Sequence, residues 1–209
     1  MAELDENDIL SIVTFDETAR TVLAPTHVRD KGLILSKVTP LVTGGSTNLY
    51  DGLKDGFEAV ETSLAQAQGY ENRVIVITDA GQNTGTTSDV EILWLVNEFA
   101  AKGIGLTAIG VGGNFNETLT RGITQGRGGN YVFVQSGRDM YRYFESFDFL
   151  VTPVAYALRA GITLADVGAK LEKTYGVPGT ASPGGLIHVE TLFFTGEGGG
   201  AIVLQYKLQ

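Results

Sequence analysis

The stretch Gly44-Gly45-Ser46-Thr47-Asn48-Leu49-Tyr50-Asp51-Gly52-Leu53, together with Val74-Ile75-Val76-Ile77-Thr78-Asp79, decides the fold. The first is a glycine-rich loop that runs into a helix, and the second is an apolar strand that ends in a carboxylate. In an open α/β sheet, ligands bind outside the carboxyl ends of the parallel strands. We therefore expect Thr47 and Asp79 to face one crevice, where a hydroxyl and a carboxylate suit a hard cation. The alternative is that Thr47 caps a helix and Asp79 opens a turn.

Around these stretches, apolar strands alternate with amphipathic helices. The helix after the loop carries one apolar face, whose residues recur at steps of three and four: Leu49, Leu53, Phe57, Val60 and Leu64. Residues 74–77 are apolar on both faces, as expected of the middle strand of a parallel sheet between helices. Further strands are predicted at residues 9–15, 20–23, 106–111 and 131–134, and further helices at residues 31–38, between Ser88 and Gly103, from Glu117 onward, and around residues 140–147. This order predicts a doubly wound, mostly parallel α/β sheet with right-handed crossovers.

The helix that begins at Ser88 has the clearest local signals. Ser88-x-x-Glu91 is the pattern of a capping box, and Gly103 is a suitable helix end. Its inward stripe is expected to consist of Ile92, Leu95, Val96 and Phe99. Trp94 lies beside that stripe, and we expect it to pack against a neighbouring helix, because tryptophan is usually largely buried.

Near residue 151 the sequence pattern changes from alternating strands and helices to strands separated by turns. We divide it into an α/β domain at residues 1–150 and a β-rich appendix at residues 151–209. In the appendix, strands are expected at residues 154–158, 188–194 and 201–208, between turns rich in Gly and Pro. Three or four antiparallel strands are too few for an independent sandwich, so exposed edges are expected.

Composition restricts the function. With 43% hydrophobic and 19% charged residues the chain is globular, and its formal charge of -9 argues against a nucleic-acid partner. The absence of cysteine removes disulfides and thiolate sites. No apolar run is long enough to span a membrane, and the first residues show no signal-peptide pattern.

Four segments, in this order, closely resemble the von Willebrand factor A (vWA) domain in its bacterial form: DILSIVTF at 8–15, GGSTNLYDGL at 44–53, RVIVITDAGQNTG at 73–85 and GIGLTAIGVGGNFN at 103–116. The family has a metal-ion-dependent adhesion site made from an Asp-x-Ser-x-Ser loop after the first strand, a Thr in a later loop and an Asp after the central strand. Thr47 matches the second part and Asp79 matches the third. The first part is missing, since the chain opens on a segment that resembles the end of the family's first helix leading into its second strand.

The resemblance implies a protein-binding module whose metal site is incomplete. Mg²⁺, Mn²⁺ or Ca²⁺ is expected to bind Thr47 and Asp79 only weakly, with a carboxylate of a partner protein filling an open position. Ser46, Asn48, Gln82 and Asn114 are expected to line the rim. The resemblance favours a location in the bacterial cell envelope or periplasm. Because the first strand is missing, we also expect either self-association into a homo-oligomer or a strand supplied from elsewhere.

Two other functions stay open. In the first, the site is inert and the chain has a structural or assembly role, pairing its exposed strand edges with another polypeptide. In the second, the fold serves an α/β enzyme. Catalytic residues are not expected, because the loop Gly44-Gly45-Ser46-Thr47-Asn48 misses the Gly-x-Ser-x-Gly pattern, and neither His27 nor His188 lies in a catalytic motif.

Overall fold

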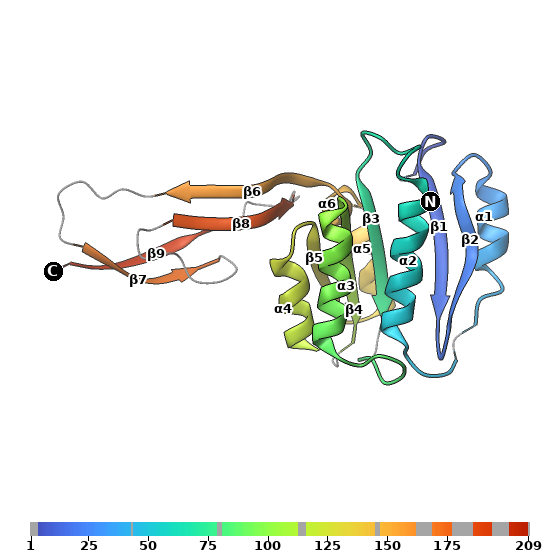
Figure 1. Cartoon of the computed structure of the whole chain (residues 1–209), viewed down its shortest axis with the longest axis horizontal. Helices are drawn as coiled ribbons and strands as arrows, with labels where there is room; N and C mark the ends of the chain where they lie inside the picture. The colour runs from blue at the N-terminus through green and yellow to red at the C-terminus, as the bar shows by residue number, and fades with distance from the viewer. Residues whose placement is uncertain are drawn as a thin grey trace.

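The computed structural model describes residues 4–42, 44–78, 81–112, 116–144, 147–161, 169–176, 186–193 and 201–208. It has an α/β part followed by antiparallel strands (Figure 1). The elements of the α/β part are β1 (Ile9–Phe15), β2 (Ala19–His27), α1 (Lys31–Val38), α2 (Leu49–Ser63), β3 (Asn72–Thr78), α3 (Asp89–Ala101), β4 (Ile104–Val111), α4 (Glu117–Gln125), β5 (Gly129–Val134), α5 (Gly137–Phe144) and α6 (Asp148–Val151).

A parallel sheet forms the centre of the α/β part. Its strand order is β3-β4-β5, with Val74 of β3 opposite Leu106 of β4 and Ala108 of β4 opposite Tyr131 of β5. One face of the sheet packs against α2, α3 and α4 around Phe57 and Phe99, whose rings stack 4.7 Å apart. The other face packs against α5 and α6 around Leu150. Helices on both faces confirm the predicted doubly wound α/β fold.

The expectation that residues 74–77 form the middle strand of the sheet is wrong. The middle strand is β4, and among the described strands β3 pairs only with β4. The apolar pattern correctly predicts a strand with helices on both of its faces. The pattern does not show how many other strands lie beside it in the sheet. As a result Ile77 is 45% exposed.

The N-terminal strands form a separate antiparallel pair. β1 and β2 pair with each other, and within the described part of the chain no strand pairing joins either of them to the three-stranded sheet. The strand expected at residues 20–23 is longer than predicted, since β2 extends from Ala19 to His27. Within the described residues, the strand predicted at residues 9–15 has only this antiparallel partner.

Most helices agree with the sequence patterns. Ile92, Leu95, Val96 and Phe99 are buried as expected, and α3 ends just before Gly103, whose φ is +84°. The prediction for Trp94 is wrong, because its side chain is 69% exposed. Trp94 lies on α3 beside the buried stripe, so its side chain points away from the core into solvent. Within the described residues, no helix is both long and apolar enough to cross a membrane.

The C-terminal part consists of two antiparallel pairs, β6 (Pro153–Gly161) with β8 (Leu186–Phe193) and β7 (Ala169–Tyr175) with β9 (Val203–Leu208). β7 was not recognised in the sequence. The β6–β8 pair contacts the α/β part, because the backbone N–H of Gly128 donates to Thr191 Oγ1 at 2.7 Å and the Tyr156 hydroxyl donates to Glu71 Oε1 at 2.9 Å.

Arg73 joins the sheet to the elements around it. Its side chain is only 3% exposed, and it donates to the Val151 carbonyl at 2.9 Å, to Thr107 Oγ1 at 3.1 Å and to the Gly128 carbonyl at 2.7 Å. Burial lowers the pKa of the guanidinium, while Glu71, 3.1 Å away, acts in the opposite direction. A single side chain therefore satisfies buried acceptors on α6, β4 and the loop before β5.

Gly105 makes room for this guanidinium. A Cβ at residue 105 would lie 2.8 Å from Arg73 Nη2 and 2.9 Å from the Gly128 carbonyl oxygen. Both distances are too short for a carbon atom, so a side chain at this position would displace Arg73 from its acceptors. The sequence pattern does not indicate this arrangement, since Arg73 simply precedes the apolar run.

Replacing Arg73 with alanine is expected to lower the free energy of unfolding by about 3 kcal/mol, because several buried acceptors lose their donor at once. Chemical denaturation measures this change. Arg29→Ala is the matched control, since Arg29 is exposed, and its effect should stay within about 0.5 kcal/mol. A loss below about 1 kcal/mol for Arg73→Ala would contradict the assigned role.

Candidate functional site

Thr47 lies at the carboxyl edge of the sheet, held by the loop that leads from β3 to α3. Its backbone N–H donates to Asn83 Oδ1 at 2.7 Å, and its carbonyl accepts from the Asn83 backbone N–H at 3.1 Å. This reciprocal pair joins the loop before α2 to the loop after β3. Both bonds use the backbone of Thr47, so they leave its hydroxyl oxygen to other partners.

Asn48, predicted to line the rim, instead has a structural role. It is 4% exposed and is the N-cap of α2, its Oδ1 accepting from the Asp51 backbone N–H. Its Nδ2 donates to Asp51 Oδ2 at 2.7 Å and to the Glu17 carbonyl at 3.2 Å, and its backbone N–H donates to the Asp16 carbonyl at 2.8 Å. Asn48 therefore attaches the β1–β2 turn to the start of α2.

Gly85 packs directly on the Asn48 amide. Its φ is +68°, and a Cβ at this position would collide with Asn48 Oδ1. Only glycine combines this backbone conformation with so close an approach. The loop after β3 thus contacts the loop before α2 at two points. Asn83 hydrogen-bonds to Thr47, and Gly85 packs against Asn48.

Gln82 also takes part in fixed contacts. Its Nε2 donates to Asp89 Oδ1 at 2.6 Å and to the Thr87 carbonyl at 3.3 Å. The second oxygen of Asp89 accepts from Asn116 Nδ2 at 2.7 Å, and Asn116 in turn caps α4. The carboxylate of Asp89 therefore ties the starts of α3 and α4 together.

Sequence reasoning did not identify Asn83 or Asp89 as residues of this edge. The signal was weak, since Asn83 lies in a polar loop where asparagine is common, and Asp89 reads as an ordinary acidic residue in the first turn of a helix. Their roles depend on which loops come together, and a single local pattern does not show this.

The other predicted site residues are distributed as follows. Ser46 is partly buried beside Thr47. Asp79 and Asn114 lie outside the described residues, so their predicted roles stay predictions. The structure thus places Thr47 and Ser46 together at the carboxyl edge and assigns Asn48 and Gln82 to the loop framework.

The described residues by themselves do not fit a metal ion. Hard cations need several oxygen ligands, usually with carboxylates among them. Within the described part of the chain, no three His, Asp or Glu residues gather in a way that could hold a metal. The Asp89 carboxylate already accepts from two amides, and Thr47 offers a single hydroxyl.

Comparison with known proteins identifies the family. The von Willebrand factor type A domain matches residues 1–145. Among curated proteins, the uncharacterized protein YfbK of Escherichia coli is 29% identical over 135 residues, covering 64% of this chain and 23% of that protein. The uncharacterized protein sll0103 of Synechocystis is 26% identical over 144 residues, covering 68% of this chain and 32% of its own length. The chain therefore spans about a quarter to a third of these relatives.

Solved structures share the fold. A von Willebrand factor type A protein from Catenulispora acidiphila has a TM-score of 0.60 at 14% identity, covering 91% of this chain and 47% of that one. Proximal thread matrix protein 1 from the mussel byssus, with a zinc-occupied metal-ion-dependent adhesion site, has a TM-score of 0.56 at 22% identity, covering 70% and 37%. Manganese-loaded TRAP protein of Plasmodium vivax has a TM-score of 0.51 at 17% identity, covering 98% and 79%.

Replacing Asn48 with alanine is expected to lower the free energy of unfolding by about 1 to 2 kcal/mol, because α2 loses its cap and the Glu17 carbonyl loses a donor. Thermal or urea denaturation measures the change. Asn7→Ala removes an exposed amide and should have almost no effect. If both variants were equally stable, Asn48 would not hold the loops together.

Proposed function

Because the chain belongs to the von Willebrand factor type A family, we propose that it is a non-catalytic protein-binding module that contacts its partner at the carboxyl edge of the sheet. The fold is often used for protein interaction or metal-dependent adhesion. To this general use the proposal adds two points of its own, the place of contact and the absence of catalysis. Both curated relatives are bacterial, and neither has an assigned function.

The interlocked loops at this edge are the observation that carries the proposal. Asn83 fixes Thr47, and Asp89 accepts from Gln82 and Asn116. A binding surface benefits from such order, because loops that are already fixed lose little conformational entropy when a partner binds. The starts of α2, α3 and α4 meet here, so backbone N–H groups add a positive partial charge to the edge.

The environment of the two histidines supports a role without catalysis. His188 lies in β8, with Nδ1 3.4 Å from Glu190 Oε1, and His27 ends β2. Both are on strands outside the carboxyl-edge loops. Neither is placed to act as a base beside the hydroxyl of Thr47.

Metal ions have a limited part in this proposal. Thr47 would supply a hydroxyl and Asp79 a carboxylate, and water or a carboxylate of the partner would complete the coordination. Since the Asp89 carboxylate at this edge already accepts from two amides, we propose that Mg²⁺ or Mn²⁺ binds weakly, at millimolar concentrations. The bound cation would then attract an acidic residue of the partner protein.

Titration with Mn²⁺ tests this proposal. We expect weak, saturable heat in calorimetry, and in NMR spectra we expect paramagnetic broadening centred on the amides of Thr47, Ser46 and Asn83. Asp79→Ala should abolish the heat, because it removes the one carboxylate of the proposed pair. Asp55→Ala, which removes a carboxylate from the side of α2, should leave it unchanged. Broadening spread over the acidic surface, or equal heat in both variants, would refute the metal site.

A further inference from the structure

α3 presents an apolar pair of side chains to solvent. Trp94 is 69% exposed, and Val90, one helical turn earlier, is 56% exposed. Residues four positions apart lie above one another on a helix, so the two side chains form one ridge along the outer face of α3. Within the described part of the chain, Trp94 makes no hydrogen bond and no ring contact. Its indole is therefore open to a partner.

The residues on either side of the ridge pack against neighbouring helices. Toward α4, Leu93 fills the space that a Cβ at Gly122 would need. Toward α2, Lys102 Nζ lies 3.2 Å from Glu98 Oε1 and 2.9 Å from Glu61 Oε1. α2, α3 and α4 lie side by side on one face of the sheet (Figure 1). The ridge thus runs along the middle helix of this layer and faces away from the sheet.

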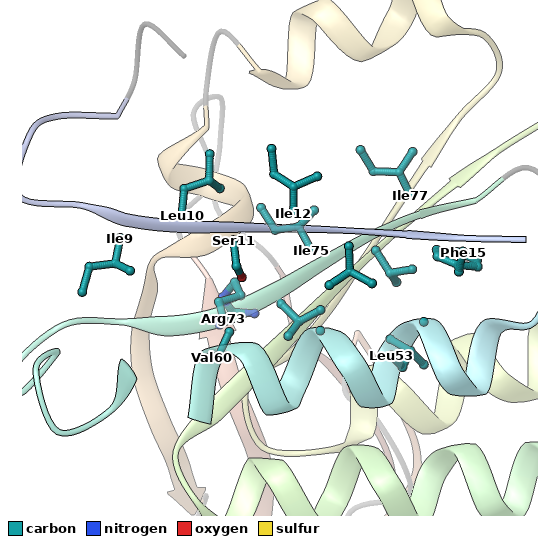
Figure 2. A pocket seen from close by; sticks show the side chains of 15 residues that line it. Ile9, Leu10, Ser11, Ile12, Phe15, Leu53, Val60, Arg73, Ile75 and Ile77 are labelled. Carbon is teal, nitrogen blue, oxygen red and sulfur yellow. The ribbon is translucent and has the colours of Figure 1, made fainter. Parts of the chain in front are cut away.

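The surface around the ridge is acidic. Leu53 and Val60 of α2 point toward β1 and β3 (Figure 2), so the carboxylates of this helix are kept off its inner face. The side chain of Glu58 is 52% exposed on α2, and that of Glu98 is 63% exposed on α3. α2 and α3 together carry seven acidic residues, and the basic residues on or next to them are Lys54 and Lys102.

Two carboxylates flank the indole directly. Glu91 lies three residues before Trp94 and Glu98 four residues after it, so both are its neighbours on the helix surface. Ser88 Oγ accepts from the Glu91 backbone N–H at 3.4 Å. The carboxylate of Glu91 does not return this bond, and it has no hydrogen-bond or ion-pair partner as far as the described residues extend. Glu98 is paired with Lys102, whereas Glu91 is available to an incoming cation.

An exposed indole beside an unpaired carboxylate suits an arginine. A guanidinium stacks flat on an aromatic ring and can donate two parallel hydrogen bonds to a carboxylate at the same time. The chain uses such stacking within itself, since the guanidinium of Arg73 lies 4.9 Å from the centre of the Phe193 ring and that of Arg127 lies 3.9 Å from the centre of the Tyr156 ring. Lysine has the charge but lacks the planar group.

We propose that the outer face of α3 is a docking surface for a basic segment of a partner protein, with an arginine stacked on Trp94 and bonded to Glu91, and an apolar residue on Val90. The two ridge residues are about 6 Å apart along the helix axis. Residues two apart in an extended segment have about the same spacing. Such a segment therefore fits both contacts.

Charge selects this partner over a second copy. A basic segment complements the chain's formal charge of -9 and the acidic helices around the ridge. Two copies packed through this face about a two-fold axis would instead bring like charges together. The surface uses neither Thr47 nor Asp79, so it is separate from the proposed metal site.

Fluorescence of Trp94 reports binding directly, because the chain has one tryptophan. The probe is acetyl-Gly-Leu-Ser-Arg-Gly-Leu-Ser-Arg-Gly-amide, used at low salt with EDTA present. We expect a saturable change in emission and protection from acrylamide quenching, and both should weaken as salt is added, because exposed charges are screened. A peptide with lysine in place of both arginines should bind at least about threefold more weakly.

Variants of the chain locate the binding. Glu91→Gln keeps the fluorophore and should weaken binding at least about threefold, since the unpaired carboxylate is lost. Glu6→Gln is the matched control, because it removes one exposed carboxylate from the turn before β1, and it should bind as wild type does. Trp94→Ala, measured by anisotropy of the same peptide carrying fluorescein, should weaken binding at least about tenfold. Both altered side chains of α3 are exposed, and circular dichroism checks that the variants fold.

Any of four results would overturn the proposal. These are the absence of saturable binding, binding by Glu91→Gln and Trp94→Ala as tight as that of the control, equal binding of the arginine and lysine peptides, and self-association of the free chain in light scattering that Trp94→Ala abolishes. The last would assign the face to a second copy. Because EDTA is present throughout, failure here is distinguishable from failure of the metal site at the carboxyl edge.

Discussion

The structure depends on a constraint at β3: as far as the described residues extend, this strand is paired along one side only. Its pairing with β4 runs from Asn72 to Thr78 without interruption, and it fixes both ends of the strand. At the amino end, the pairing positions Arg73 against acceptors on α6 and before β5. The carboxyl end of β3 leads into the loop in which Asn83 accepts a hydrogen bond from the backbone of Thr47.

The sequence predicted the local elements well, because each depends on a short pattern. The helical spacing of Leu53 and Phe57 and the run of apolar residues 74–77 identified α2 and β3, and both lie where the motifs placed them. The expected pairing of Thr47 with Asp79 stays a prediction, because Asp79 lies outside the described residues. It failed where the answer depends on neighbours far along the chain: β3 is not the middle strand, Trp94 is exposed, and Asn48 caps a helix.

Backbone hydrogen exchange in the free chain is the most direct test of the central claim that β3 is paired on one side. The amides of β3 that bond to β4 should be strongly protected, and the intervening amides, which face away from β4, should exchange rapidly, giving an alternating pattern along residues 72–78. β4, paired on both sides, should be protected throughout. Uniform protection along β3 in a monomeric chain would show that both sides of the strand are paired, and it would contradict this account.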